Sequence, residues 1–123
     1  MAREFHRSDR LGSQIQREVA DLIHTELRDP RLGMVTVSDV EVSRDLSVAK
    51  VFVTLLAATD PVRACINHLN QHAQTLRWEL GQRLSIRSVP ELRFVYDDSI
   101  ERGMKMDSLL HRLAQDTKSA DTE

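Results

Sequence analysis

The side chains that could carry chemistry are few. His68 and His72 stand four residues apart, which places both imidazoles on one face of a helix, as zinc ligands often are. A zinc site needs further ligands, however, and the metalloprotease motif requires Glu directly after its first His, where this chain has Leu69. We therefore expect no metal site and interpret the two histidines as half-exposed helix residues.

The single cysteine and a pair of aspartates also have structural explanations. Cys65 shares an apolar helical stripe with Val62 and Leu69, which predicts a buried thiol rather than a nucleophile. Asp97 and Asp98 could bind a cation, but a strand end followed by a helix cap explains them more simply. Gly-rich phosphate loops, G-x-S-x-G and C-x-x-C are all absent from the sequence. The sequence therefore predicts no enzyme and no cofactor.

The cations are the other candidates. Most of the 17 are Arg, whose guanidinium binds phosphate in a bidentate manner. They gather in residues 1–17 and 77–93, whereas the last seventeen residues are more acidic. The net charge of −2 gives no overall attraction to nucleic acid. From charge alone, a solvated surface of mixed sign is the simpler interpretation.

The first half of the chain predicts one helix and a hairpin. Apolar residues at helical spacing indicate a helix over 9–28, which the dipeptide Asp29-Pro30 stops. Two runs rich in β-branched residues, 34–42 and 48–56, predict antiparallel strands. In the first run the valines change parity, so a bulge near Ser38-Asp39 is needed to bring all four to one face.

The second half predicts two helices, a strand and a short terminal helix. Asp60-Pro61 has the pattern of an N-cap and a first helical residue. One helix from there to Leu84 would span ~36 Å, longer than a strand of ~25–30 Å, so we expect a break between His72 and Thr75. A strand follows over 92–96.

Asp98 and Glu101 have capping-box spacing and predict the start of the last helix, which should end near Leu113. The expected order is α-β-β-α-α-β plus a tail, an α+β domain with helices on one face of a three-stranded sheet. We assign residues 1–113 to the domain and 114–123 to a flexible polar tail. A membrane helix and a signal peptide are not indicated, so we expect a cytoplasmic protein.

The predicted break suggests a binding site. Free backbone N–H groups at the start of the second helix, with Arg77 and Arg83 beside them, could hold an RNA phosphate. Trp78 could stack on a base, or it could cover the edge of the core. The residues alone leave both interpretations of Trp78 open.

Five short segments resemble the ribosome-binding factor A family in order and spacing. They are DPRLG at 29–33, SRDL at 43–46 with AKV at 49–51, VPELRF at 89–94, YDDS at 96–99 and GMKM at 103–106. Each motif alone is weak, but together they cover about residues 1–115. The resemblance implies a type II KH-like fold in which an Ala-x-Gly kink replaces the usual Gly-x-x-Gly loop. The matching positions are Ala73, Gln74 and Thr75, so the third departs from the pattern. Lys105 stands where Arg is common in the family.

The resemblance also implies a function. Such a protein is a bacterial, cytoplasmic, non-enzymatic assembly factor that binds the immature small (30S) ribosomal subunit. It assists late 16S rRNA maturation, including 5′ end processing, and is linked to cold adaptation. We expect it to be a monomer when free, with assembly GTPases as possible further partners.

The RNA contacts that we expect come from arginines in the N-terminal arm, the loops and the helix pair: Arg3, Arg7, Arg10, Arg31, Arg44, Arg77, Arg83 and Arg87. Arg31 and Arg44 are the weaker candidates, because their segments and Asp45 are explained equally well as turn scaffold. The alternative hypothesis is a KH-like protein-interaction module that does not touch RNA. The acidic balance and the missing Gly-x-x-Gly motivate it.

Overall fold

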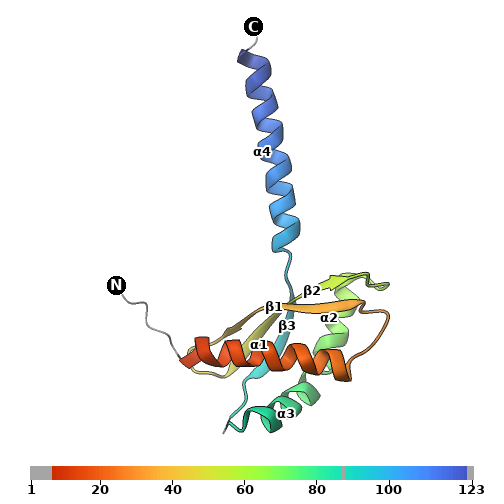
Figure 1. The fold of residues 1–123 in the computed structure, drawn as a ribbon, viewed down its shortest axis with the longest axis vertical. Helices are drawn as coiled ribbons and strands as arrows, with labels where there is room; N and C mark the ends of the chain where they lie inside the picture. Colours follow the sequence, from red (N-terminus) through yellow and green to blue (C-terminus); the bar gives the residue numbers. More distant parts are fainter. Residues whose placement is uncertain (1–6, 87, 122–123) are drawn as a thin grey trace.

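The structure, a computed structural model, describes residues 7–86 and 88–121 (Figure 1). Its elements, in chain order, are α1 (Arg7–Glu26), β1 (Met34–Val42), β2 (Val48–Leu56), α2 (Val62–Gln71), α3 (Ala73–Leu84), β3 (Glu91–Tyr96) and α4 (Ser99–Asp121). The α+β class and the predicted element order are confirmed. No helix in the described part of the chain has the length and apolar character needed to cross a membrane.

The sheet has β2 at its centre, antiparallel to β1 and parallel to β3. The predicted bulge is confirmed, because the register of β1 shifts between Val37 and Asp39. The shift keeps Val35, Val37 and Val40 on the buried face. In this sheet β3 is an edge strand, and α2 packs against it.

Helices α1, α2 and α3 cover one face of the sheet, as predicted, with α1 over β1 and the other two against β3 (Figure 1). The core between these layers is aliphatic and includes Ile15, Val19, Leu22, Val51, Val53, Leu69, Leu76 and Leu80. Cys65 is buried in it, as the apolar stripe predicts, and burial raises the pKa of its thiol. The thiol is thus poorly placed to act as a nucleophile.

The turn between α1 and β1 depends on a glycine. The helix ends at Glu26, two residues earlier than predicted. Gly33 then adopts a φ of 63°, in the left-handed region. A Cβ atom there would lie 2.2 Å from the carbonyl oxygen of Leu56 and 2.6 Å from the amide nitrogen of Ala58. Only glycine fits this approach of two backbones.

The predicted cap of α2 is wrong by one residue. Pro61, with a ψ of 151°, is the N-cap, and its carbonyl accepts a hydrogen bond from the Cys65 N–H at 3.0 Å. Asp60 makes no cap; its backbone N–H donates to the carbonyl of Arg31 at 3.2 Å. Asp60 therefore ties the start of α2 to the α1–β1 turn.

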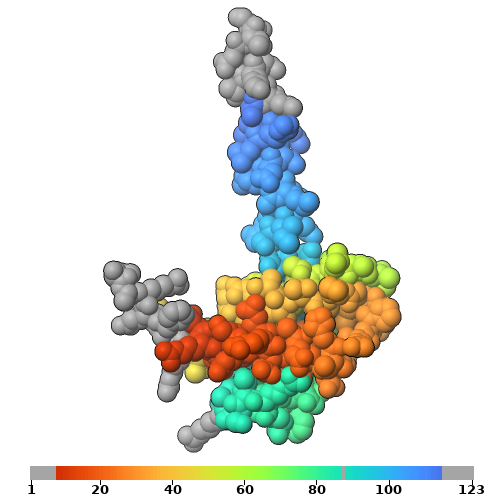
Figure 2. All heavy atoms as spheres, viewed as in Figure 1, coloured from red at the N-terminus to blue at the C-terminus, as the bar shows by residue number. Residues whose placement is uncertain are grey.

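The last helix is longer than predicted. Residues 104–121 contain neither Gly nor Pro, so nothing in their sequence stops a helix near Leu113. The backbone stays helical to Asp121, and the expected division at 113/114 falls inside α4. Figures 1 and 2 show α4 projecting away from the sheet, and its side chains over 99–114 are exposed.

The expected capping box at the start of α4 is also wrong. Asp97, not Asp98, accepts a hydrogen bond from the Ser99 N–H, at 2.9 Å. Asp98 instead forms an ion pair with Arg102, and Glu101 accepts a hydrogen bond from the Tyr96 hydroxyl. A carboxylate one residue earlier than predicted therefore accepts the hydrogen bond from the first N–H group of the helix.

Asp97 links this junction to β1 and predicts a pH effect. Hydrogen bonds from the Ser38 hydroxyl, at 2.5 Å, and from Ser99 lower the pKa of Asp97 to about 2. A carboxyl with a lowered folded-state pKa stabilises the fold above its unfolded pKa and loses that contribution as pH falls. We expect the thermal midpoint to fall between about pH 4 and pH 2, and to fall less in Asp97→Asn. Circular dichroism melts across this range test it; identical pH profiles would contradict it.

Candidate nucleic-acid interface

A groove of about 540 Å³ lies between the α2–α3 break and the outer edge of β3. Its lining comes from the end of α2, the start of α3 and the first half of β3: Asn70, Gln71, Ala73, Gln74, Arg77, Glu91, Leu92 and Arg93. The break therefore lies beside a sheet edge, which the sequence alone did not show.

The break itself is at His72, one residue before the predicted triplet. His72 has a φ of −96° and a ψ of 2°, and its N–H bonds back to the carbonyl of Leu69 at 3.1 Å. The triplet of Ala73, Gln74 and Thr75 forms the first turn of α3. First-turn N–H groups have no acceptor within their own helix, and this end of the helix dipole is positive. Because Ala73 and Gln74 line the groove, this wall suits an anion.

Asn70 pairs with the outer edge of β3. Its side-chain nitrogen donates to the Phe94 carbonyl at 3.1 Å, and the Phe94 N–H donates to its oxygen at 2.8 Å. Backbone groups along a parallel strand alternate between the two neighbouring sides. Leu92 therefore directs its N–H and C=O to the same outer side as Phe94, and it lines the groove. Leu92 as a whole residue is only 2% exposed, so little of its backbone is open to solvent.

Two arginines give the groove its positive charge. Arg77 donates from Nε and Nη2 to the Val89 carbonyl, at 3.0 and 2.7 Å, and so fixes the segment before β3. Arg93 has a side chain that is 57% exposed, with Nε 3.6 Å from a Glu91 carboxylate oxygen. Lys50 is its register partner on β2. The guanidinium of Arg93 is thus the more available for a phosphate.

Arg93, Lys50 and Asn70 are not among the site residues that the sequence indicated. The alternation of Arg93 with the buried Leu92 and Phe94 was a usable signal, because it places Arg93 opposite the core. Nothing in the sequence could have indicated Asn70, whose role depends on where α2 crosses the edge of β3.

Arg83 is held in an ion-pair cluster rather than at the groove. Its Nη1 lies 2.6 Å from Asp21 and 3.1 Å from Glu18, both on α1. Two carboxylates thus more than balance its charge, and the arginine joins α3 to α1. The expected phosphate clamp of Arg77 with Arg83 is therefore not assembled at the groove.

The ion-pair cluster predicts a stability effect. Arg83→Glu would place three carboxylates together, and we expect the free energy of unfolding to fall by about 1 kcal/mol, since the groups are partly exposed. Arg83→Gln should cost less. Urea unfolding followed by circular dichroism measures both; a Glu variant as stable as the parent would contradict the cluster.

The other predicted arginines are dispersed. Arg31 binds the Asp29 carboxylate through Nε and Nη2, at 3.2 and 2.8 Å, and these hydrogen bonds lower the pKa of Asp29 to about 2. Arg10 on α1 and Arg44 in the hairpin loop are exposed. For Arg7 only the backbone, at the start of α1, is described. Arg3 and Arg87 lie outside the described residues.

The remaining candidates are also placed. Asp45 accepts hydrogen bonds from Ser43 and Ser47 side chains, each at 2.7 Å, and so acts as turn scaffold. The His68 and His72 rings lie 4.7 Å apart, and no cluster of three or more potential metal ligands forms among the described residues. Trp78 is 64% exposed, so its interpretation as a cover for the core edge is wrong.

Comparison with known proteins gives one family. A model of the family described as ribosome-binding factor A matches residues 7–110. A ribosome-binding factor A from Stutzerimonas stutzeri is 46% identical over 125 residues, covering 98% of this chain and 97% of the relative. One from Vibrio campbellii is 44% identical over 119 residues, covering 96% and 88%.

Solved structures agree with the sequence relatives. The crystal structure of Thermus thermophilus ribosome-binding factor A is similar with a TM-score of 0.63 and 31% identity, over 72% of this chain and 94% of that one. A homology model of the Thermus protein, fitted into a cryo-EM map of a 30S complex with ribosome-binding factor A, has a TM-score of 0.60 and 31% identity. That match covers 71% of this chain and 91% of the Thermus chain.

Proposed function

This chain belongs to the ribosome-binding factor A family, and on that premise we propose that it binds the small ribosomal subunit through rRNA at the α2–α3 groove. The Thermus relative fitted into a 30S complex supports the choice of subunit. The observation that carries the choice of surface is the groove itself, where the positive end of α3 and the exposed Arg93 lie beside the outer edge of β3. The protein acts by binding rather than by catalysis.

The groove suggests how RNA is held. A phosphate would lie near the first turn of α3 and Arg93, and the attached base would lie along the outer edge of β3. Most of this affinity comes from phosphate contacts, so binding should weaken steeply as salt rises. We also expect a preference for unpaired nucleotides, whose base edges are accessible.

The finer role that we propose follows the family. The protein assists late maturation of 16S rRNA near the decoding region, including 5′ end processing, and leaves before translation. Its place of action is the cytoplasm, where it works as a monomer, alongside assembly GTPases and with particular importance in the cold. Precursor 16S rRNA that persists in a strain lacking the protein, most strongly in the cold, would support this role; normal 5′ processing would contradict it.

A protein-interaction module remains the second candidate, and α4 is the observation that favours it. Met106, Leu109, Leu110 and Leu113 recur at helical spacing on α4 and are exposed. An apolar stripe of this kind suits a protein groove better than a phosphate backbone. If binding to the subunit depended on this stripe and not on the groove, the second candidate would replace the first.

Cosedimentation tests the choice of subunit. Purified protein is mixed with isolated small subunits, isolated large subunits or intact ribosomes at low and moderate salt. We expect selective binding to free small subunits that declines with salt. Equal binding to both subunits would indicate unspecific attraction and count against the proposed function.

A further inference from the structure

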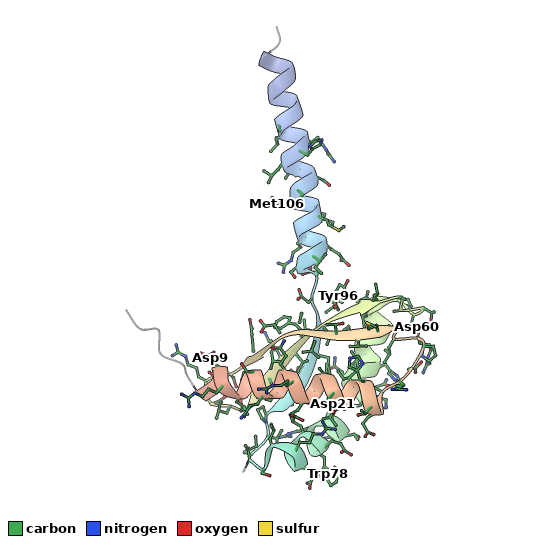
Figure 3. All side chains as sticks on the ribbon, viewed as in Figure 1. Asp9, Asp21, Asp60, Trp78, Tyr96 and Met106 are labelled. Carbon is green, nitrogen blue, oxygen red and sulfur yellow. The ribbon has the colours of Figure 1, made fainter. Side chains whose placement is uncertain are left out.

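Trp78 is the one tryptophan of the chain, and it is placed where it adds little to the core. The indole is 64% exposed, whereas its neighbours on α3, Leu76 and Leu80, are almost fully buried. Figure 3 shows Trp78 on the outer side of α3, away from the sheet. An exposed tryptophan leaves a large aromatic face in water, where it is free to contact another molecule.

The helical face that carries Trp78 is polar and uncharged. Gln74, Thr75 and Gln82 lie three or four residues away on the same helical face, and all three are exposed. Among the described residues of α3, Trp78 is the only large hydrophobic side chain that is exposed. A surface that docks another protein is typically a contiguous apolar patch of several hundred Å². A lone ring among amides instead resembles the stacking platforms of single-stranded nucleic-acid sites.

This face is continuous with the groove. Gln74 lines the groove and lies one helical turn before Trp78. A strand that leaves the groove past Gln74 would next reach the indole. No carboxylate occupies positions 74, 75, 78 or 82 to repel its phosphates, and the amides of Gln74 and Gln82 can pair with base edges.

We propose that Trp78 is a stacking site for an unpaired RNA base, next to the groove. This inference rests on the proposed function, because the groove must first hold the strand. The indole covers one face of the base, and the neighbouring glutamine amides reach its edge. Single-stranded rRNA is therefore the ligand class, since bases in a duplex are already stacked on their neighbours.

Fluorescence tests the stacking directly, because the chain has one tryptophan. Short single-stranded RNA should quench the indole emission on binding, whereas an abasic strand with the same sugar-phosphate backbone should bind more weakly and quench little. Affinity is followed independently by the anisotropy of labelled RNA. We expect Trp78→Ala to weaken binding by about tenfold, and Trp78→Phe, which keeps an aromatic face, to retain most of the affinity. Because the side chain is exposed, both variants should fold as the parent does, which circular dichroism checks.

The outcomes separate the stacking site from the proposed function. RNA that binds without quenching, with unchanged affinity in Trp78→Ala, overturns the stacking site and leaves the groove intact. Equal quenching by abasic RNA also overturns it. Unchanged RNA affinity in Trp78→Ala, together with weaker binding of that variant to small subunits, assigns Trp78 to a protein contact instead. RNA that fails to bind at all, together with small subunits that fail to bind, overturns both proposals.

Discussion

Gly33→Ala is expected to lower the free energy of unfolding by about 3 kcal/mol or more, the largest stability effect among the substitutions proposed for this protein. The added methyl would meet backbone atoms of Leu56 and Ala58 at 2.2 and 2.6 Å. Neither atom can rotate away, because both are backbone atoms, one in the last residue of β2 and one in the segment after it. The φ of 63° adds strain for any residue with a Cβ. Chemical unfolding followed by circular dichroism gives the value.

Gly103→Ala is the matched control. A Cβ at Gly103 meets nothing within 4 Å, and α4 stands apart from the domain (Figure 2). We expect the free energy of unfolding of the domain to stay within about 0.5 kcal/mol of the parent value, with a slightly higher helix content. Similar losses of unfolding free energy for both substitutions would show that the close approach of two backbones at Gly33 does not control the stability of the domain.

Arg93→Glu is expected to weaken binding to small subunits by about tenfold or more, the largest binding effect of any single charge change at the groove. Removing one phosphate contact should also make the decline of log affinity with log salt less steep, by about one unit of slope. The Arg93 side chain is exposed and only loosely paired with Glu91, so the domain should remain folded. Equilibrium binding to labelled subunits, measured at several salt concentrations, gives both quantities.

Arg28→Glu controls for the change in net charge. Arg28 is exposed two residues after the end of α1, its Nε donates to the His24 carbonyl, and it does not line the groove. We expect a much smaller loss of affinity. Equal effects of Arg28→Glu and Arg93→Glu would mean that the subunit senses overall charge rather than this groove. Arg83 is unsuitable for such a test, because its reversal also disturbs the contact between α1 and α3.

The sequence predicted those structural features that depend on residues close together in the chain. The change of valine parity in β1 predicted its bulge, since only a bulge lets Val37 and Val40 share the buried face. The length of the region from Val62 to Leu84 predicted a helix break, because one straight helix would overrun the sheet. The structure places that break at His72.

The site depends on contacts between distant segments, and there the sequence was less informative. The partners of Arg83 lie 62 and 65 residues away, so charge clustering along the chain could not show that Arg83 pairs with α1. Asn70 pairs with Phe94 across 24 residues, only because α2 crosses the edge of β3. Helix α4 was predicted too short because its apolar repeat ends at Leu113, while its backbone propensity continues to favour a helix.

Ultraviolet crosslinking of the protein bound to small subunits, followed by mass spectrometry of the crosslinked peptides, maps where rRNA contacts the protein. We expect rRNA nucleotides attached to peptides that contain residues 70–78 and 91–93, with fewer such adducts in Arg93→Glu. Nucleotides attached only to α4 or to the hairpin loop, with the groove peptides unmodified, would contradict it.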